Sequence, residues 1–534
     1  MAFLTLYLLY VIIVLFLIIY LKLVFKCKRA VKISDSVKRH IEKNHKNSDQ
    51  YLVQPPGPLP LPLIGNLALL GKYDVPFEGF SALSKIYGDV YSLTLGTIRC
   101  VVVNNLETIK EVLNQNGIFF GGRPDFERFH RIFGGDRNNS LALCDWSNLQ
   151  QKRRNLARKH CSPRNNTDYF EKLNEVGCTE VEKCIEHMKK MVQDTAGEIH
   201  MKPMIMETCA NLFLGYMCST RFEYDDIDFK NMVKSFDEIF WEINQGYAVD
   251  FLPWLSPFYK KHMQTLDSWA KVIRKFILNR VIGNRDEKIR MQNENDDDFT
   301  DALLRSLAKE ENVTKNTIIF MLEDFLGGHS AIGNLVYLSL GYIAKYPQIG
   351  KRIQEEIHAM SQNGKRKITL HDAEDMPFTI ATLFEILRHT SSPIVPHVAT
   401  ENSLINGYGI FKDTIVFINN YELNMSEKYW EHPKEFNPER FLEYVPVHKL
   451  KKDNALDSSM VLRVKKNIPQ FLPFSIGKRT CIGQNLVKSY SFLMLINILQ
   501  NFDVSCENTE NIKMYKACLA VPPETYSLKF TARR

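Results

Sequence analysis

The chain has 534 residues, of which 45% are hydrophobic and 11% aromatic, so it can bury a large core, either as two average domains or as one big one. Its formal net charge of +7 is mild, and its one obvious basic run is too short and too poor in aromatic residues to predict a nucleic-acid partner. Eleven cysteines without pairing spacings predict a reducing compartment and no disulfide framework.

The first 21 residues are predicted to form a transmembrane anchor. Residues 2–21 carry no charge and are almost wholly apolar, which is long enough to cross a bilayer as a helix. A cleaved signal peptide would need a shorter apolar core, basic residues in front of it and a small-residue cleavage site, and these features are missing. The residues that follow are basic and are expected to stay cytosolic by the positive-inside rule, namely Lys22, Lys26, Lys28, Arg29 and Lys32.

Residues 22–54 are expected to form a basic juxtamembrane segment and a polar linker, with the linker over residues 41–50. A proline-rich hinge follows over residues 55–66. Clustered prolines are stiff and extended, so the hinge sets a defined offset between the membrane helix and the globular part. No internal repeat or second break in composition follows, and residues 55–534 are predicted to form one large domain.

Helices are predicted for most of this domain, with minor strands at residues 90–95, 98–103 and 414–418. The longest helix is expected to start after Thr314, whose side chain suits a helix N-cap, and to continue through an apolar-rich stretch to Tyr346, where Pro347 stops it. A basic run on an earlier helix is either a solvated face or a docking surface for an acidic electron donor. That run comprises Lys152, Arg153, Arg154, Arg158 and Lys159.

Two adjacent glycines, Gly327 and Gly328, lie inside the longest predicted helix, although glycine weakens a helix. They form either a packing pair or a place where the backbone comes close to a ligand or to oxygen. Further along the chain, Glu385 and Arg388 lie three residues apart on one helix face. Such an ion pair is commonplace on a surface helix and does not by itself indicate a site.

The most informative run lies near the C-terminus and reads Phe474-Ser-Ile-Gly477-Lys-Arg479-Thr-Cys481-Ile-Gly483. Gly477 and Gly483 permit unusual dihedral angles and a close approach of the backbone. Arg479 supplies a fixed cation, and Cys481 stands just before an apolar helical stretch whose positive end favours the thiolate. A thiolate that holds haem iron needs a loop of this kind. The alternative is a buried cysteine in a glycine-containing turn.

The spacing in this run resembles the haem-binding loop of the cytochromes P-450, and the sequence resembles that family along most of its length. The resemblance implies a mainly α fold with small β-sheets and haem b (iron protoporphyrin IX) as cofactor, with dioxygen and NADPH-derived electrons as co-substrates. It also implies a single-pass protein of the endoplasmic reticulum membrane whose catalytic domain faces the cytosol. Its partners would be membrane lipid, NADPH–cytochrome P-450 reductase and, as a second donor, cytochrome b5.

The family's motifs imply roles for individual residues. Cys481 would be the axial ligand of the haem iron, and Phe474 would shield its sulfur and keep it a strong electron donor. Glu385 and Arg388 would be buried and joined by Arg440, which lies in Pro438-Glu439-Arg440-Phe441. The implied haem contacts are Arg479, His397 after Pro396, Arg153 or Arg154, Trp146, and the glycines Gly477 and Gly483.

The longest helix corresponds to the family's central helix, which crosses the distal face of the haem, and here the sequence departs from the family. Most members carry an acid and then an alcohol that relay protons, and these positions hold Ser330 and Ala331. Ser330 or His329 with an ordered water could replace the relay, the substrate could contribute a hydroxyl, or the chemistry could need less proton delivery. His329 could also simply pack against a neighbouring helix.

A second departure concerns the haem propionates. The family usually places a tryptophan four residues before an arginine, and Leu149 occupies that position relative to Arg153. Trp146 lies seven residues before Arg153, which would place it two turns back on the same helix face. The segment Gly122-Arg123-Pro124-Asp125-Phe126 resembles the broader microsomal members of the family.

The run from Gly327 to Asn334, Gly-Gly-His-Ser-Ala-Ile-Gly-Asn, resembles that of the Spook and Spookier group of arthropod enzymes. This resemblance implies a monooxygenase that acts on a sterol in an early step of ecdysteroid (moulting hormone) synthesis, between 7-dehydrocholesterol and the ketodiol. Residues 213–257, rich in aromatic side chains, would form a substrate roof suited to a flat apolar sterol. The alternatives are a broad-specificity detoxifying monooxygenase and a haem-thiolate isomerase or ligand-binding protein that does not reduce dioxygen.

Overall fold

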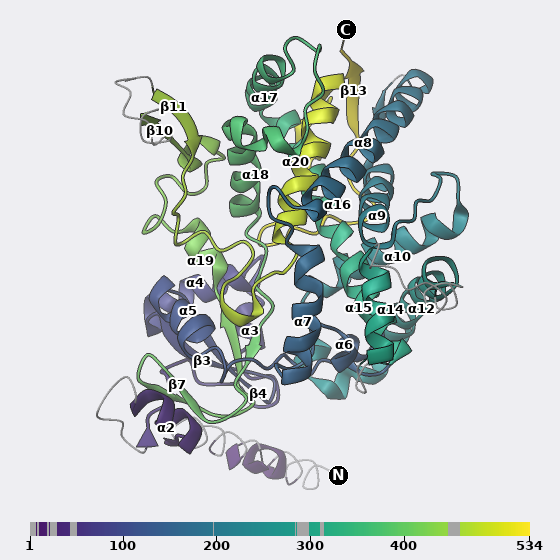
Figure 1. Cartoon of the computed structure of the whole chain (residues 1–534). Coiled ribbons are helices and arrows are strands. Elements are labelled where there is room, and N and C mark those ends of the chain that lie inside the picture. The colour runs from purple at the N-terminus through teal and green to yellow at the C-terminus, as the bar shows by residue number, and fades with distance from the viewer. Residues whose placement is uncertain are drawn as a thin grey trace.

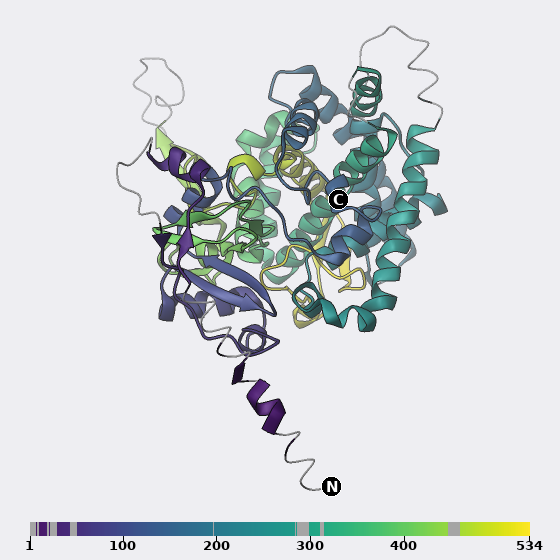
Figure 2. The ribbon, with the colours of Figure 1, turned by 90° about the horizontal axis from the view of Figure 1, so that it is seen from below.

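The computed structural model describes residues 29–42, 51–195, 197–283, 285, 298–309, 314–446 and 460–533, together with a few residues between positions 7 and 21. Helices make up most of this part of the chain. In Figure 1 the helices from α8 to α16 occupy the right and centre, and the four-stranded sheet with its short helices lies at the lower left. The same division into a sheet-containing side and a helical side is visible from below in Figure 2.

The helices follow one another in short steps along the chain. The α-helices are α2 (Asp35–Glu42), α3 (Leu67–Leu70), α4 (Pro76–Tyr87), α5 (Leu106–Lys110), α6 (Glu127–Ile132), α7 (Asn148–Cys161), α8 (Asp168–Asp194), α9 (Lys202–Cys218), α10 (Ile227–Ile243), α11 (Ala248–Phe251), α12 (Lys260–Phe276), α14 (Phe299–Lys309), α15 (Lys315–Leu326), α16 (Gly328–Lys345), α17 (Pro347–Met360), α18 (Pro377–Thr390), α19 (Asn420–Met425) and α20 (Gln484–Asn501). The 3₁₀ and π segments are η1 (Glu111–Gln115), η2 (Arg137–Asn139), η3 (Pro253–Tyr259), η4 (Ile277–Ile282), η5 (Leu370–Asp375), η6 (Pro438–Phe441), η8 (Gly477–Arg479) and η9 (Thr509–Asn511).

The largest sheet joins early and late parts of the chain. It has the order β3 (Val90–Leu95), β4 (Ile98–Val103), β9 (Ile415–Ile418) and β6 (His397–Val398), with β4 and β9 parallel and the other pairs antiparallel. The smaller sheets are β12 (Phe502–Ser505), β13 (Leu528–Ala532) and β5 (Glu198–Ile199); β10 (Leu442–Pro446) and β11 (Met460–Val464); β7 (Ser403–Ile405) and β8 (Tyr408–Ile410); and β1 (Val31–Lys32) and β2 (Tyr51–Leu52). The predicted strands 90–95 and 98–103 are confirmed at both ends, and the third begins one residue later than predicted, at Ile415.

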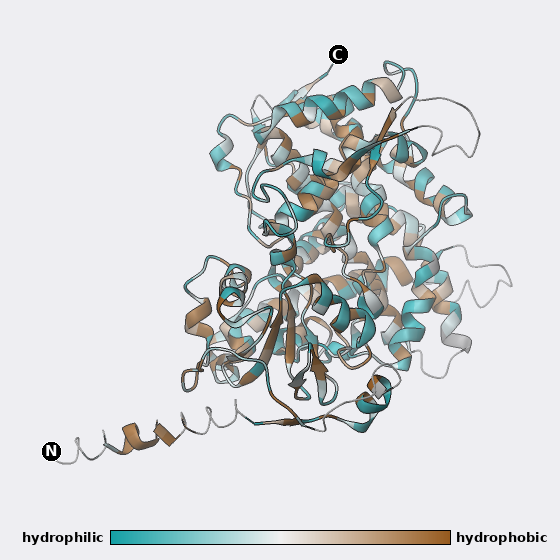
Figure 3. Ribbon diagram, turned by 90° about the vertical axis from the view of Figure 1, so that its left-hand side faces the viewer, coloured by the Kyte–Doolittle hydropathy of each residue, from teal (hydrophilic) through white to brown (hydrophobic). Residues whose placement is uncertain are grey.

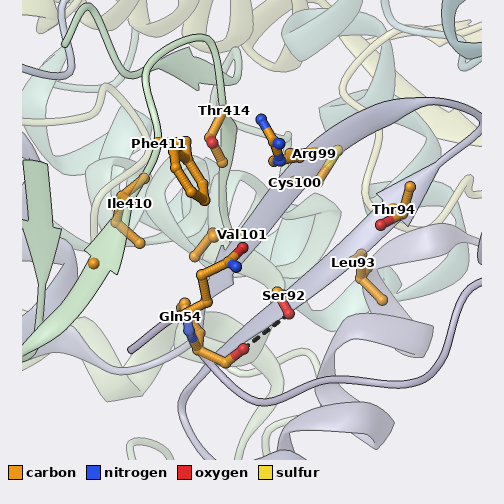
Figure 4. Close-up of a pocket in the computed structure, with 12 residues that line it drawn as sticks. Gln54, Ser92, Leu93, Thr94, Arg99, Cys100, Val101, Ile410, Phe411 and Thr414 are labelled. Atoms are coloured by element: carbon orange, nitrogen blue, oxygen red, sulfur yellow. Dashed lines mark hydrogen bonds between the residues drawn. The ribbon is translucent and has the colours of Figure 1, made fainter. Parts of the chain in front are cut away.

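The proline-rich hinge lies directly on strand β3. Ser92 donates from its backbone N–H to the Pro56 carbonyl at 2.7 Å and from its hydroxyl to the Pro55 carbonyl at 2.9 Å. A Cβ on Gly57 would overlap the Ser92 carbonyl oxygen, so only glycine lets the hinge come this close. Figure 4 shows the Ser92 contact beside a pocket that is lined by none of the predicted site residues.

The packed body begins before the hinge. Strand β1 pairs with β2, and Ile33 and Val37 of the following segment are buried against the sheets. Residues 31–42, expected as juxtamembrane segment and linker, therefore contain a strand and a helix, whereas residues 43–50 lie outside the described residues. Figure 3 shows how apolar the described N-terminal residues are. Most of the predicted anchor over residues 1–21 also lies outside the described residues. Among the described residues, no helix has the length and apolarity needed to cross a bilayer.

The central helix starts as predicted but is interrupted. Thr314 caps α15, and its side chain and that of Thr317 form a reciprocal capping box. Regular helix ends at Leu326 and resumes at Gly328, so the predicted single helix is in fact α15 followed by α16. Helix α16 ends at Lys345, and Pro347 opens α17. Helix α16 lies in the middle of the helical side, buried between α9 and α20.

A buried ion cluster joins α18 to the segment after α19. Both oxygens of Glu385 accept from Arg388, at 2.7 and 2.8 Å, and one also accepts from Arg440 at 3.1 Å. The Asn437 N–H donates to the same carboxylate at 2.8 Å. Glu385 and Arg388 are completely buried, and both guanidinium groups lie over the Trp430 ring. The ion pair of Glu385 and Arg388 is therefore buried and does not lie on the surface. Both oxygens of the Glu385 carboxylate accept hydrogen bonds.

Replacing Glu385 by alanine is expected to lower the free energy of unfolding by about 3–5 kcal/mol, because two buried guanidinium groups lose their carboxylate. Haem-loaded yield and thermal unfolding of the full chain measure the effect. Glu439→Ala is the matched control, because Glu439 pairs with Arg352 at the exposed surface and should cost less than about 1 kcal/mol. Equal losses from the two variants would contradict the prediction.

Candidate active site

The loop from Phe474 to Gly483 folds back on itself before α20. The Cys481 N–H donates to the Phe474 carbonyl at 2.8 Å, and the Thr480 hydroxyl donates to the Phe474 and Ser475 carbonyls at 3.3 and 3.2 Å. Ser475 and Gly477 have left-handed backbone angles, with φ of 57° and 75°. These bonds hold Cys481 at the tip of a closed turn that leads straight into a helix.

The two glycines of the loop have different reasons to be glycine. Gly477 has positive φ, and a Cβ there would overlap the Leu113 carbonyl oxygen, so the conformation and the close packing both require glycine. Gly483 has an ordinary φ of −91°, and an added Cβ would meet no described atom within 4 Å. The prediction of an unusual dihedral angle is therefore wrong for Gly483. Its closeness to a bound group remains a proposal.

Cys481 is an exposed residue, in contrast to most of the other described cysteines, which are buried. Burial raises the pKa of Cys481 above its ordinary value, and the Gly483 backbone N–H and Arg154 act in the opposite direction. In the protein alone, burial therefore opposes the stabilisation of the thiolate that is expected from the helix end. A coordinated metal ion deprotonates a thiol regardless of this preference.

Arg479 is buried beside the loop and only partly paired. Its Nε and Nη2 donate to the Gly121 carbonyl at 3.2 and 2.6 Å, and Nη2 also donates to the Cys144 carbonyl. Its Nη1 is buried without a partner among the described residues. Burial lowers the pKa of Arg479 to about 10, so the guanidinium stays charged at neutral pH. An unpaired buried cation of this kind fits an anionic ligand group.

His397 of β6 presents a second unpaired nitrogen. Its Nδ1 lies 2.7 Å from the Phe120 carbonyl, which can only accept, so Nδ1 carries the hydrogen. Nε2 is buried and has no partner within the described ranges. Burial, together with the nearby Arg123, lowers the pKa of His397 well below its ordinary value. A carboxylate placed at Nε2 would favour the charged ring and accept its N–H.

Helix α7 contributes two arginines. Arg154 donates from Nη2 to the Thr480 carbonyl at 2.6 Å and so contacts the loop directly. Arg153 donates from Nη1 to the Asn138 carbonyl at 3.3 Å, and its buried Nε has no partner in the part of the chain that the structure describes. Arg154 therefore braces the loop, whereas Arg153 keeps a free donor.

Trp146 reaches the loop by a route that differs from the predicted one. Helix α7 begins at Asn148 with Ser147 as its N-cap, so Trp146 lies before the helix and not two turns back on its face. Its backbone N–H donates to the Gly121 carbonyl at 3.0 Å, and its ring lies 5.6 Å from Lys478 Nζ and 5.8 Å from the Arg479 guanidinium carbon. The indole thus packs on the cations of the cysteine loop.

These groups fit a haem. Three buried nitrogen atoms from three segments lack a partner among the described residues, namely Arg479 Nη1, Arg153 Nε and His397 Nε2. The two arginine nitrogens are donors suited to carboxylates, and His397 Nε2 becomes a third when the ring is protonated. Cys481 would supply the sulfur that binds the haem iron, and Phe474 lies in the same closed turn. Haem bound there would supply the activation of dioxygen. The side chains of Arg479, His397 and Arg153 would bind and neutralise its propionates, and Arg154 holds the loop that carries the thiol.

The glycine pair of the central helix faces aromatic side chains. A Cβ on Gly327 would lie 3.3 Å from Phe236 Cε1 of α10, and one on Gly328 would lie 3.1 Å from Phe213 Cε1 of α9. Ala331 is half-buried, whereas Ser330 is completely buried and its hydroxyl has no partner among the residues described. His329 lies against α10, with its ring 5.2 Å from that of Phe236.

Two site-supporting residues were not singled out from the sequence. Arg123 is buried and donates to the Val395 and Pro396 carbonyls at 2.8 and 3.1 Å, which positions His397. Asp324 of α15 accepts from the Ser140 hydroxyl at 2.9 Å and from the Leu141 N–H, and burial raises its pKa to about 7. The signals were the Gly122–Phe126 segment and an acidic residue within an apolar helix.

A closed cysteine loop framed by buried cations, together with a long helix interrupted at a glycine pair, defines a haem-thiolate protein. The family model described as Cytochrome P-450 matches residues 55–530. The chain therefore belongs to the cytochrome P-450 family, which makes it a haem b monooxygenase that uses dioxygen and NADPH-derived electrons supplied by a redox partner.

Individual relatives agree with this assignment. Cytochrome P-450 307a1 of Drosophila melanogaster is 54% identical over 521 residues, which cover 96% of this chain and 95% of that protein. Cytochrome P-450 1A1 of Opsanus tau is 31% identical over 465 residues (83% and 84%), and Cytochrome P-450 1A5 of Gallus gallus is 29% identical over 481 residues (87% and 86%). The predicted family and the predicted likeness to the Spook group are confirmed.

Replacing Cys481 by alanine is expected to abolish the red-shifted ferrous-carbonyl absorption that distinguishes thiolate from histidine ligation, because the axial sulfur is lost. Absorption spectra of the reduced protein under carbon monoxide measure this. Cys506→Ser is the control, since Cys506 lies outside the loop, directly after β12, and should leave the band intact. A Cys481→Ala protein that kept both haem and band would contradict the assignment.

Proposed function

We propose that this monooxygenase oxidises a sterol in an early step of ecdysteroid synthesis, between 7-dehydrocholesterol and the ketodiol. The proposal is supported by the 54% identity to Cytochrome P-450 307a1, which extends over nearly the whole chain. It is also supported by the run from Gly327 to Asn334, which resembles the Spook and Spookier group. The observation that carries the proposal is the aromatic wall that the structure builds against this run.

The wall consists of Phe213 and Phe236, which are buried and pack against Gly328 and Gly327. The aromatic stretch 213–257, proposed as the substrate roof, spans the end of α9, then α10, α11 and part of η3. Large rigid apolar side chains next to a bare glycine backbone favour a flat, rigid, apolar ligand over a flexible or charged one. A sterol ring system has this shape.

The run from Gly327 to Asn334 also contains the positions at which most family members deliver protons. These positions hold Ser330 and Ala331, so the usual acid and alcohol are missing. We propose that the Ser330 hydroxyl holds a water at this point, because it is buried and unpartnered within the described part of the chain. A hydroxyl can both accept and donate, so it can pass a proton on without becoming charged. A hydroxyl of the substrate is the alternative source.

The protein is proposed to be a single-pass protein of the endoplasmic reticulum membrane, with residues 1–21 as anchor, residues 22–54 as the connecting segment and residues 55–534 as a catalytic domain in the cytosol. Apolar side chains are exposed on the proline-rich hinge and on η3. The two segments meet at the β3–β4 turn, where Gly96 contacts both Ile64 and Phe251. We call these side chains the hinge patch, which comprises Leu59, Leu61, Leu63, Trp254 and Phe258. Such a patch beside the hinge suits contact with lipid.

Reductase is the expected electron donor from the family, and cytochrome b5 is proposed as a second donor. The basic face of α7 suits an acidic partner, because Lys152 and Arg158 are exposed on the helix whose Arg154 contacts the cysteine loop. A partner docked there would lie close to Cys481.

The substrate assignment predicts that a host lacking the protein accumulates 7-dehydrocholesterol or the sterol formed directly from it, and that supplied ketodiol bypasses the loss. Purified protein with reductase and NADPH should oxidise that sterol and leave drug-like probes unchanged. Sterol extracts analysed by mass spectrometry measure both outcomes. Turnover of many unrelated probes with no change in host sterols would favour the detoxifying monooxygenase instead.

Deleting residues 1–21 is expected to release the protein from microsomes only in part, because the hinge patch still contacts lipid. Adding Trp254→Ser and Phe258→Ser should release the remainder, since each exposed aromatic side chain contributes about 2 kcal/mol on transfer into an apolar phase. Sedimentation of microsomes measures the bound fraction.

The matched control for this deletion is Tyr444→Ser with Met460→Ser, two exposed apolar residues of the β10–β11 hairpin, which should not change binding. Protease added outside intact microsomes should digest the globular part of the full chain. Its protection would place the domain in the lumen and overturn the proposed topology.

A further inference from the structure

The hydrogen bonding of the central helix changes at one point. The last regular bond of α15 runs from the Gly327 N–H to the Glu323 carbonyl at 2.9 Å, and α16 begins with the next residue. The Ser330 N–H then donates to the Gly327 carbonyl at 3.2 Å, three residues back. In a regular α-helix it would donate to Leu326, four residues back.

The Leu326 carbonyl is occupied by a side chain. His329 Nδ1 lies within hydrogen-bond distance of this oxygen, and because a carbonyl only accepts, Nδ1 carries the hydrogen. His329 is 1% exposed, and its Nε2 has no partner among the described residues. Burial lowers the pKa of His329 to about 4, so the ring is neutral at physiological pH and has one N–H to donate.

The ring of His329 is also held from the other side. It stands edge-on to Phe236 of α10, with the planes at 89° and the centroids 5.2 Å apart. The imidazole is therefore fixed between a helix carbonyl and an aromatic ring. Gly327, with no side chain of its own, leaves room for Phe236 at this point.

This arrangement matters because Ala331 has no hydroxyl. A serine or threonine in a helix can donate to the carbonyl four residues back and so bend the helix. For position 331 that carbonyl would be Gly327, and alanine cannot make the bond. The histidine two residues earlier makes a side-chain bond to the neighbouring carbonyl instead.

We propose that His329 is a positioning residue whose Nδ1–H holds the Leu326 carbonyl and thereby keeps the turn from Gly327 to Ser330 in its three-residue hydrogen bonding. This turn places Ser330 and the glycine backbone for the monooxygenase reaction. The inference rests on membership of the cytochrome P-450 family and not on the sterol, so it stands or falls independently of the proposed substrate.

Two variants separate the donor from the ring. His329→Phe keeps a ring against Phe236 and removes the N–H, whereas His329→Asn loses the ring but places an amide N–H near the position of Nδ1. His329→Leu, a smaller side chain without a donor, repeats the test if the phenylalanine does not fit. His358→Phe, on the exposed face of α17, is the matched control.

The first readout is hydrogen–deuterium exchange of the full-length, haem-loaded proteins, which needs no substrate. Without the donor, the Ser330 N–H returns to Leu326 and the helix closes, so exchange of the peptide containing residues 328–330 should slow by about fivefold in the phenylalanine and leucine variants. The asparagine variant and the control should stay within about twofold of the parent protein. Unchanged or faster exchange in the variants without a donor would overturn the proposal.

The second readout is hydrogen peroxide formed per NADPH consumed with reductase present. We expect it to rise by about tenfold or more in the phenylalanine and leucine variants, because a small displacement of the reacting segment strongly reduces productive turnover. The asparagine variant should restore the parent value. A series in which phenylalanine behaves like the parent and asparagine does not would show that His329 acts only by packing, which also overturns the proposal.

Discussion

The buried carboxylate of Glu385 holds together the segments that precede the cysteine loop. It is completely buried and accepts from Arg388, Arg440 and the Asn437 N–H, so that α18, the segment after α19 and η6 are fixed to one another. Burying three charges is costly unless every one is satisfied, and here further carbonyls from Asn424, Pro433 and Glu431 complete the two guanidinium groups. The chain that leaves this cluster forms β10 and β11 and then enters the cysteine loop.

The charged groups of the Glu385 cluster and those around the cysteine loop differ in how completely they are hydrogen-bonded. In the Glu385 cluster every donor has a protein acceptor, whereas Arg479, His397 and Arg153 each keep one buried nitrogen unpaired within the described residues. A ligand with carboxylate groups would complete this set of nitrogens. The fully paired guanidinium groups of the Glu385 cluster leave no donor for such a ligand.

Local patterns predicted the parts of the fold that local forces decide. The strands 90–95 and 98–103, the Thr314 cap and the pairing of Glu385 with Arg388 all follow from alternation, capping and helical spacing. The packed segment 31–42 could not be predicted in this way, because Ser34 bonds to Glu401 and Asn402, far along the chain. Its polar composition therefore resembled a linker.

The site was predictable in its residues more than in its geometry. The loop motif identified Cys481 and Arg479, but the raised pKa of Cys481 depends on the protein packed around it, which the motif does not contain. The spacing of Trp146 from Arg153 predicted a place on a helix, whereas Ser147 caps the helix and its first residue is Asn148. The interruption at Gly327 depends on the His329 side chain, which donates to the Leu326 carbonyl in place of the Ser330 N–H. Helical spacing alone does not show which of these two donors occupies the carbonyl.

The parallel pairing of β4 with β9 has a consequence for how the protein is made. It joins residues 100–103 to residues 415–418, and Cys481 follows later still. Long-range pairing of this kind cannot begin until most of the chain has left the ribosome, and contacts distant in sequence form slowly. During translation the early strands wait with one edge uncovered, and the prosthetic group can enter only when synthesis is almost complete. Supply of haem and the pace of elongation therefore act on the same late stage of biogenesis.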